Sequence, residues 1–450
     1  MTGPKTDETT RRELFRNTGR VAAASALAGV AVPLVHAGEN NTIKLAIVGC
    51  GGRGTGAVGN ALSVAGENVK LVAMADLFED RLNSSHEQLH GQFGPKVDVP
   101  RERRFLGFDA YKKAIDCLKP GDVALLTTHA AFRATHLDYA VEKGVNIFME
   151  KTFAPDPGGV KQVLRAGQAA EAKNLKLATG LMCRHSTARQ AMIQKTRDGE
   201  MGTIELIRAY RMGPFPGMDP WKPGPSELLW QIRRPYYFHW LSSGLFIEMN
   251  IHQIDECCWI KDALPVSALG LGGRAADSTD CSQNLDTYSV EYTFPDGTKA
   301  LVAGRYLNRT HNDFATYVHG TKCAGQFSGN IHAATVNTFK DQRIGRAHIA
   351  WKAQPEQHDP WQAEWYDLLK AIRADQPYNE SRRACMTNLA ALMGRAAVHT
   401  GSIVTWDEMT SSSFQFCPNV AQLTKDSPSP FAADSKGRYP VPVPGEWTEV

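Results

Sequence analysis

The chain has 450 residues, of which 42% are hydrophobic and 22% charged, and its formal net charge is +3. This near-neutral charge excludes the basic surface that binding to nucleic acid or to an anionic membrane requires. The nine cysteines contain no C-x-x-C pair, which argues against a zinc site and a dense disulfide framework. We therefore expect no metal, and the length suits two domains or one domain with a large second lobe.

Residues 1–37 have the pattern of a secretory signal peptide. The basic stretch TRRELFR (10–16) precedes the 15-residue apolar run Val21–Val35, which is too short to span a bilayer as a helix. The Arg11-Arg12 pair has the twin-arginine form, although an amphipathic helix with a chance arginine pair is the alternative. We expect a periplasmic protein exported by the twin-arginine route, without a later membrane segment. The remaining chain holds 45 basic and 44 acidic residues, so its net charge is +1.

The segment that follows predicts a dinucleotide-binding βαβ unit. TIKLAIVG (42–49) is typical of a buried strand, and VKLVAMAD (69–76) is a second strand that ends in an acid. Between them lie three glycines in G-x-G-x-x-G spacing, namely Gly49, Gly51 and Gly54. Strand, glycines, helix-length spacer, second strand and terminal acid together are far more specific than the glycines alone.

Each residue of this turn has a physical task. Gly49 permits the tight turn, Gly51 lets the backbone approach a pyrophosphate, and Gly54 lets helix and strand pack closely. Asp76 would accept hydrogen bonds from a ribose diol, and no Arg or Lys follows it directly to hold a 2′-phosphate. We therefore expect NAD rather than NADP. The cofactor-binding turn is completed by Gly52 and Arg53.

Further strands alternate with helical patterns. VALLTT (123–128), NIFMEK (146–151) and KLATG (176–180) are strand-like, which predicts a parallel, doubly wound Rossmann sheet in a domain over residues 38–155. Ligands of such sheets bind at the carboxyl ends of the strands. The residues at those ends, which we add to the cofactor site, are Thr127, Thr128, His129, Glu150 and Lys151.

In the second half of the chain the pattern changes from alternating strands and helices to successive strands. Strand-like runs follow one another over 203–212, 266–274, 286–294 and 299–307, and PDG joins the last two as a hairpin. The predicted fold class is therefore α/β, with the Rossmann domain followed by an α+β domain (156–405) that has a large, mostly antiparallel sheet. An open face of that sheet would favour a homodimer or homotetramer. The Pro-rich end, 406–450, is expected to be an extended surface arm.

Several of these segments resemble the Gfo/Idh/MocA family, which includes glucose–fructose oxidoreductase and inositol dehydrogenase. The resemblance rests on GCGGRG (49–54), DLFEDR (76–81), THAAFRATH (128–136) and EKT (150–152), and it covers nearly the whole chain after residue 37. It implies that two C-terminal helices pack back on the Rossmann domain. Thr152 stands where the family's E-K-P motif has proline.

The resemblance also implies a reacting centre. The family uses the lysine of E-K-P and a D-x-x-x-H pair followed by a second aspartate, which correspond here to Lys151, Glu248, His252 and Asp255 in EKT and EMNIHQID. Lys151 would steady the reacting oxygen, and His252, alone or with Lys151, would be the base that Glu248 orients. Glutamate at 248 is one methylene longer than the family's aspartate. Structural alternatives are a buried core histidine at His252 and a locally paired Asp255.

The stretch 213–240 is rich in Pro, Gly and aromatic residues, which suits either a sugar-stacking loop or a stiffened structural loop. As substrate-binding residues we expect Arg184, Tyr236, Trp240, His252 and Asp255. The substrate is then a small-molecule carbohydrate.

Export and a nicotinamide cofactor together imply a cofactor that leaves the cell already bound and is regenerated in place. We therefore expect an NAD-dependent oxidoreductase that acts on a secondary alcohol of a sugar or cyclitol. Two alternatives stay open: an NAD-dependent glycoside hydrolase that works by transient oxidation and elimination, and a non-catalytic sugar- or cofactor-binding protein.

Overall fold

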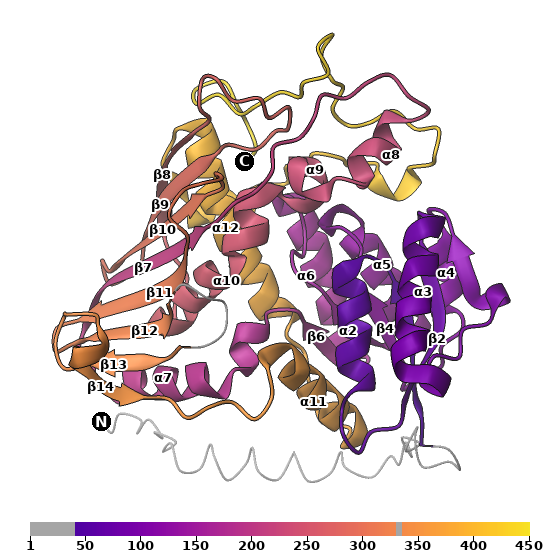
Figure 1. Ribbon diagram of the computed structural model, residues 1–450, viewed down its shortest axis with the longest axis horizontal. Helices are drawn as coiled ribbons and strands as arrows, with labels where there is room; N and C mark the ends of the chain where they lie inside the picture. Colours follow the sequence, from indigo (N-terminus) through magenta and orange to yellow (C-terminus); the bar gives the residue numbers. More distant parts are fainter. Residues whose placement is uncertain (1–40, 330–334) are drawn as a thin grey trace, which may run out of the picture. The chain divides into compact units, whose positions relative to one another are not determined.

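The computed structural model describes residues 41–329 and 335–450, and Thr42–Val450 forms one compact unit. The predicted signal peptide, 1–37, lies outside the described residues. Within that unit the chain builds two sheets, with helices between and around them (Figure 1).

The first sheet has six parallel strands in the order β3-β2-β1-β4-β5-β6. They are β1 (Ile43–Val48), β2 (Val69–Asp76), β3 (Arg104–Leu106), β4 (Val123–Leu126), β5 (Asn146–Met149) and β6 (Leu177–Thr179). Their centres are continuous apolar runs because helices cover both faces. The strand order reverses between β1 and β4, which opens a crevice at their carboxyl ends. The predicted Rossmann sheet is confirmed, and it draws its last strand from beyond residue 155.

Two helical layers cover this sheet. Side chains of α4 (Ala110–Ile115), α5 (Ala130–Lys143) and α6 (Pro157–Ala172) pack on one face. The other face is covered by α2 (Gly52–Leu62), α3 (Glu79–Phe93) and α11 (Pro360–Arg373). Although α11 comes from the far end of the chain, its Trp365 stacks on Phe148 of β5 with ring centroids 4.5 Å apart. The C-terminal part therefore packs back on the Rossmann sheet.

The second sheet has nine strands in the order β14-β13-β12-β11-β7-β10-β9-β8-β15, and only the β7–β10 pair is parallel. This confirms the predicted, mostly antiparallel sheet. Its strands are β7 (Ile204–Met212), β8 (Ser267–Gly273), β9 (Thr287–Thr293), β10 (Lys299–Arg305), β11 (Asp313–Gly320), β12 (Ala324–Ser328), β13 (Asn337–Phe339), β14 (Ile349–Lys352) and β15 (Val404–Thr405).

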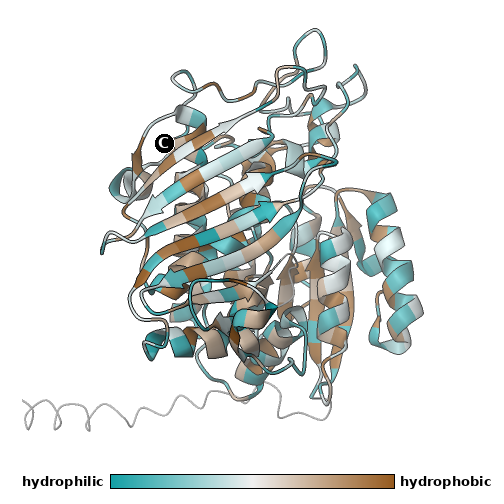
Figure 2. Cartoon of the chain, turned by 60° about the vertical axis from the view of Figure 1, so that its left-hand side comes forward, coloured by the Kyte–Doolittle hydropathy of each residue, from teal (hydrophilic) through white to brown (hydrophobic). Residues whose placement is uncertain are grey.

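One face of this sheet packs on α10 (Gly244–Lys261) and α12 (Ser381–Thr400), both of which are buried along most of their length. Among residues 41–329 and 335–450, no helix covers the other face, and apolar and polar stripes alternate across it (Figure 2). Leu269, Leu271 and Leu301 are exposed there.

The remaining helices are short and lie outside the two sheets. They are α7 (Thr187–Arg197), α8 (Glu227–Ile232), α9 (His239–Ser242) and α13 (Trp406–Ser411), with the 3-10 turns η1 (Gly94–Lys96), η2 (Arg101–Arg103), η3 (Met182–His185), η4 (Pro235–Tyr237), η5 (Arg346–His348) and η6 (Val420–Gln422).

The C-terminal stretch corrects one expectation. We predicted that 406–450 lies on the surface as an extended arm, and much of it does run outside regular structure. Its end turns inward, however, and the side chain of Glu449 is fully buried. A buried arginine and a buried histidine draw this carboxylate into the core.

Within residues 41–329 and 335–450, no helix is both long and apolar enough to span a bilayer. The same ranges contain no group of three or more His, Cys, Asp or Glu placed to bind a metal ion. All nine cysteines fall inside them as free thiols.

Candidate active site

The glycine turn between β1 and α2 is shaped for close approach of a ligand. Gly49 has φ 102°, and a Cβ there would lie 2.7 Å from the Thr128 amide nitrogen. A Cβ on Gly54 would overlap the Gly49 carbonyl oxygen and lie 2.6 Å from Thr127 Oγ1. By contrast, a Cβ on Gly51 would meet nothing within 4 Å. The turn is therefore packed tightly behind and open in front, where the free N–H groups of α2 can bind a pyrophosphate.

Asp76 ends β2 beside this turn. Its carboxylate accepts hydrogen bonds from the Cys50 amide at 2.6 Å and the Phe78 amide at 2.8 Å. Burial raises the pKa of Asp76. The two amide bonds fix the carboxylate at the carboxyl end of the strand, where a ribose diol can reach it.

Two adjoining cavities run along the crevice. The smaller, of about 100 Å³, is lined by Asp76, Phe108 and Tyr111, and the larger, of about 590 Å³, reaches Lys151 and Glu248. The residues that line both are Gly51, Arg81, Thr127, Thr128 and His129. Together the cavities join the glycine turn and Asp76 to Lys151 and Glu248, the arrangement that a dinucleotide with its reacting end at Lys151 needs.

Lys151 and Glu248 form the polar centre of the larger cavity. Lys151 Nζ lies 2.6 Å from Glu248 Oε2 and 2.9 Å from the Glu248 carbonyl oxygen. The side chain of Lys151 is 20% exposed and that of Glu248 9% exposed. Burial, the largest single cause, acts to lower the pKa of Lys151, but the charge and hydrogen bond of Glu248 together with Tyr236 and Glu150 outweigh it, and the pKa ends above its ordinary value. Lys151 is therefore an ammonium group at neutral pH, able to donate hydrogen bonds and unable to accept a proton.

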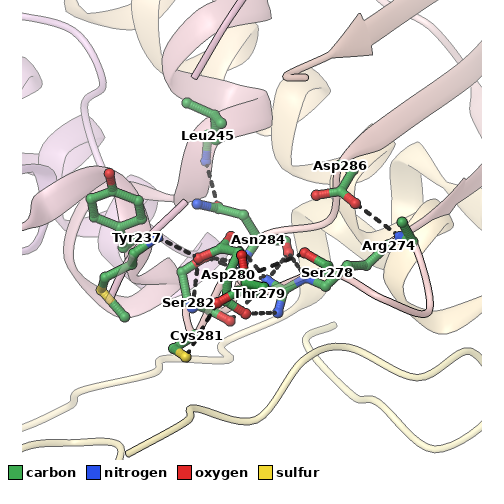
Figure 3. Close-up of polar contacts among 12 residues, drawn as sticks. Tyr237, Leu245, Arg274, Ser278, Thr279, Asp280, Cys281, Ser282, Asn284 and Asp286 are labelled. Atoms are coloured by element: carbon green, nitrogen blue, oxygen red, sulfur yellow. Dashed lines mark hydrogen bonds and ion pairs between the residues drawn. The ribbon is translucent and has the colours of Figure 1, made fainter. Parts of the chain in front are cut away.

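Tyr236 faces the same centre from η4. It lines the larger cavity, and the negative charge of Glu248, followed by burial, raises the pKa of its phenol. Asn284 supports this arrangement from behind: its Nδ2 donates to the Tyr236 carbonyl oxygen at 2.8 Å, and its Oδ1 accepts from the Leu245 amide at 3.0 Å. Figure 3 shows the polar loop around Asn284 against the start of α10, with Arg274 bonded within it. One side chain thus joins the elements that carry Tyr236 and Glu248.

Glu150 braces the other side of the cavity. It accepts from Arg53 Nε at 2.5 Å and from the Lys151 amide at 3.1 Å. A second, fully buried carboxylate, Glu364, lies 3.6 Å from Arg53 Nη2, and burial raises its pKa well above the usual range. The Lys151–Thr152 peptide is cis, and Thr152 Oγ1 donates to the Ser242 carbonyl oxygen at 3.2 Å.

Solved structures with this architecture include sugar and cyclitol oxidoreductases. A myo-inositol 2-dehydrogenase from Lactobacillus plantarum superposes with a TM-score of 0.61 at 20% identity, covering 81% of this chain and 99% of that one. An aldose–aldose oxidoreductase from Caulobacter crescentus gives 0.62 at 16%, with coverage of 81% and 99%. A scyllo-inositol dehydrogenase from Lactobacillus casei, with bound NAD(H) and scyllo-inositol, gives 0.60 at 20%, with the same coverage. The chain has the Gfo/Idh/MocA fold. No family model and no curated protein sequence matches it.

Within the Gfo/Idh/MocA fold, the structure brings most of the predicted cofactor and catalytic residues to one crevice. The predicted residues that line one or both cavities are Gly49, Gly51, Gly52, Arg53, Gly54, Asp76, Thr127, Thr128, His129, Glu150, Lys151, Tyr236 and Glu248. His252 lies one turn beyond Glu248 on α10, is buried, and lines neither cavity.

Three predicted substrate-binding residues lie elsewhere, which corrects the expectation for them. Arg184 Nε donates to Asp255 Oδ2 at 2.7 Å, and Thr387 Oγ1 donates to Asp255 Oδ1 at 2.7 Å, so this pair is satisfied by internal contacts. Trp240 is fully buried, with its Nε1 donating to Gln231 Oε1 at 2.8 Å. Its indole fills the core beneath the loop and does not stack on a ligand.

The sequence did not point to the segment Glu227–Tyr237, here called the strap, as a wall of the cofactor channel. Arg233 of the strap makes two bonds to the Asp80 carboxylate, at 2.9 and 2.8 Å. Its guanidinium lies 3.9 Å from the centroid of Phe78, a residue of the smaller cavity. These partners are far apart in sequence, so no local pattern could reveal them.

One further contact joins the strap to the loop after β4, and a second braces that loop from beneath. His129 Nε2 lies 2.9 Å from the Ile232 carbonyl oxygen, and burial lowers the pKa of His129 to about 3. Arg133 is buried beneath that loop and donates from Nη2 to the Thr128 carbonyl oxygen at 2.6 Å. Arg133 stands inside the THAAFRATH segment, but nothing in its spacing distinguished it from a surface helix residue.

Proposed function

We propose that the protein is an oxidoreductase acting on a secondary alcohol of a sugar or cyclitol, with NAD that stays bound between turnovers. The observation that carries this proposal is the Lys151–Glu248 pair on a cavity that also reaches the glycine turn, beside which Asp76 ends β2. The scyllo-inositol dehydrogenase of the same fold, solved with NAD(H) and scyllo-inositol bound, supports the choice of cofactor and substrate class.

The residues present fit a dinucleotide. The open N-terminus of α2 would hold the pyrophosphate and Asp76 the adenosine ribose, and because Leu77 and Phe78, and no Arg or Lys, directly follow Asp76, NAD is favoured over NADP. When bound, the nicotinamide takes a hydride from the substrate carbon or returns one to it.

The chain's own residues handle the proton and the oxygen. The Lys151 ammonium would donate a hydrogen bond to the reacting oxygen and steady its negative charge. Glu248 would accept the hydroxyl proton at its carboxylate, because it lines the cavity and the predicted base, His252, does not. Tyr236 stands beside both, where its phenol can hold a neighbouring hydroxyl.

Two features support a cofactor that is retained. The strap covers the crevice through contacts at Asp80, Phe78 and His129. The predicted twin-arginine signal would export the folded protein to the periplasm, where NAD is not available for exchange. A cofactor loaded inside the cell must then be recycled by two successive substrates or by re-reduction of one.

Denaturation of the purified protein tests retention. Heat treatment should release about one equivalent of NAD(H) into the supernatant, and no released dinucleotide would favour a sugar-binding protein without redox chemistry. Cleavage of p-nitrophenyl glycosides without added NAD would instead indicate the glycosidase that works by transient oxidation. Net interconversion of two sugars would agree with a cofactor that is recycled by two successive substrates.

We also propose a homo-oligomer assembled through the uncovered face of the nine-stranded sheet. Leu271 is 75% exposed on that face, and Leu269 and Leu301 flank it. Leu271→Arg should lower the molar mass in light scattering, and an unchanged mass would exclude this face.

A further inference from the structure

Glu449, the next-to-last residue of the chain, is buried and is held there by side chains of α12 and by Trp447. Glu449 Oε1 accepts from Arg395 Nε at 2.9 Å, and its Oε2 accepts from Trp447 Nε1 at 2.9 Å. His399 Nδ1 lies 3.1 Å from the same Oε2. Both charged side chains of the Arg395–Glu449 pair are at most 1% exposed, so this is a desolvated ion pair.

Arg395 carries the contact towards the active site. Its Nη1 donates to the Pro155 carbonyl oxygen at 3.1 Å and to the Ser243 carbonyl oxygen at 2.9 Å. Pro155 closes the loop that begins with Lys151, and Ser243 caps α10, the helix that carries Glu248. One guanidinium therefore joins the backbone segments on both sides of the Lys151–Glu248 pair.

Neighbouring bonds stiffen the same junction. Asn388 Oδ1 accepts from the Phe153 amide at 2.9 Å, and Ser243 Oγ donates to the Ala154 carbonyl oxygen at 3.0 Å. Both bonds are buried and involve backbone groups, so the loop from Lys151 to Pro155 has little freedom to move relative to α10. The orientation of Arg395 is set at its other end by Glu449.

We infer that Glu449 is a positioning residue for the reacting centre, acting through Arg395 on the separation of Lys151 and Glu248. This inference rests on the proposed function. Without its carboxylate, the buried guanidinium of Arg395 would turn towards another acceptor and release the two carbonyl oxygens. Because a misplacement of about 1 Å costs roughly a hundredfold in rate, a small relaxation here would lower turnover.

The test compares Glu449→Gln with Glu446→Gln, a matched change at an exposed glutamate of the same tail. Activity is measured well below the melting temperature and is expressed per molecule of bound NAD. We expect Glu449→Gln to lower kcat by about tenfold or more, with KM and NAD content nearly unchanged and Glu446→Gln like wild type. An ion pair that serves stability alone would lower the melting temperature and leave kcat per loaded molecule unchanged, which would overturn the inference.

Two readouts complete the test. Formate should restore part of the kcat of Glu449→Ala in a saturable manner by occupying the carboxylate position, and no rescue would count against the inference. Hydrogen exchange should rise in Glu449→Gln at residues 151–155 and 243–248 more than elsewhere, and uniform exchange would contradict the positioning role. If wild type itself turns over no sugar, the proposed function fails, whereas the exchange pattern still decides the role of Glu449.

Discussion

The contact between the strap and α3 should control how long the cofactor stays bound. Arg233 donates to both oxygens of Asp80, and it also lies over the ring of Phe78. Breaking these contacts frees the strap to swing away from the channel. We expect Asp80→Asn and Arg233→Ala to speed dissociation of NAD without abolishing catalysis when NAD is supplied in excess.

The size of the effect follows from the geometry. The side chains of Arg233 and Asp80 are 41% and 64% exposed, so the ion pair contributes at most about 1 kcal/mol. The stacking of Arg233 on Phe78 adds about 0.5–1 kcal/mol. Asp80→Asn, which removes the ion pair, should therefore raise the dissociation rate by about fivefold or less, and Arg233→Ala, which removes both contacts, by more than Asp80→Asn, up to about thirtyfold.

Stopped-flow fluorescence of bound NADH, chased with excess NAD, measures this rate. Asp341→Asn breaks a comparable exposed pair with Arg343 and serves as the control. The double variant Asp80→Arg with Arg233→Asp exchanges the two charges and should restore part of the slow dissociation of the dinucleotide. Bonding to Arg233 lowers the pKa of Asp80 to about 2, so the contact is complete above its unfolded pKa of about 4 and is lost only as the pH falls towards 2. Equal rates in wild type and Arg233→Ala would refute the role of the strap.

Three further changes test two other residues of the site and one buried histidine outside it. Lys151→Ala should lower kcat by at least about a hundredfold while released NAD stays stoichiometric, and unchanged turnover would remove Lys151 from the mechanism. Gly54→Ala should abolish NAD retention, because its Cβ would overlap the Gly49 carbonyl oxygen; dinucleotide released at the wild-type level would contradict this. Burial acts to lower the pKa of His185, but its bond to Asp367 raises that pKa to about 9. The contribution of this bond to the stability of the fold is therefore complete below about pH 6.5 and is lost as the pH rises through 9. Denaturant unfolding measures the free energy of unfolding of wild type and of His185→Gln, and the difference between the two should become smaller as the pH rises over that range.

The Rossmann half was predictable because its signals are local. A buried strand, a glycine turn and a terminal acid lie within 42–76, and each constrains the backbone or the ligand directly. The alternation of strands and helices then determines the parallel sheet and the edge at which ligands bind. The same logic found Lys151 at the end of β5.

Side-chain roles in the second half were less predictable. Helical spacing placed Glu248, His252 and Asp255 on one stripe, but α10 is buried on nearly every side, so the stripe does not face a single environment. Glu248 lines the cavity, His252 is buried and does not line it, and Asp255 is paired with Arg184. Periodicity predicts which residues share a face and does not tell which neighbour covers each turn.

Long-range partners had no signal in the sequence. Composition and the prolines of the last forty-five or so residues indicated an exposed arm. The burial of Glu449 depends on Arg395 and His399, which lie one turn apart on α12 and bring a guanidinium and a ring nitrogen to one place only once the chain has folded. The pairing of Arg233 with Asp80 is of the same kind.

The most direct measurement of the central claim follows the bound nicotinamide itself. Purified protein, without added cofactor, is mixed with a panel of sugars and cyclitols while the near-ultraviolet absorbance of reduced nicotinamide is recorded. We expect that one class of substrate changes this absorbance by up to one equivalent per chain and that a second, oxidised sugar reverses the change. Protein that carries NAD(H) but shows no such change with any sugar, in either direction, would contradict the central claim.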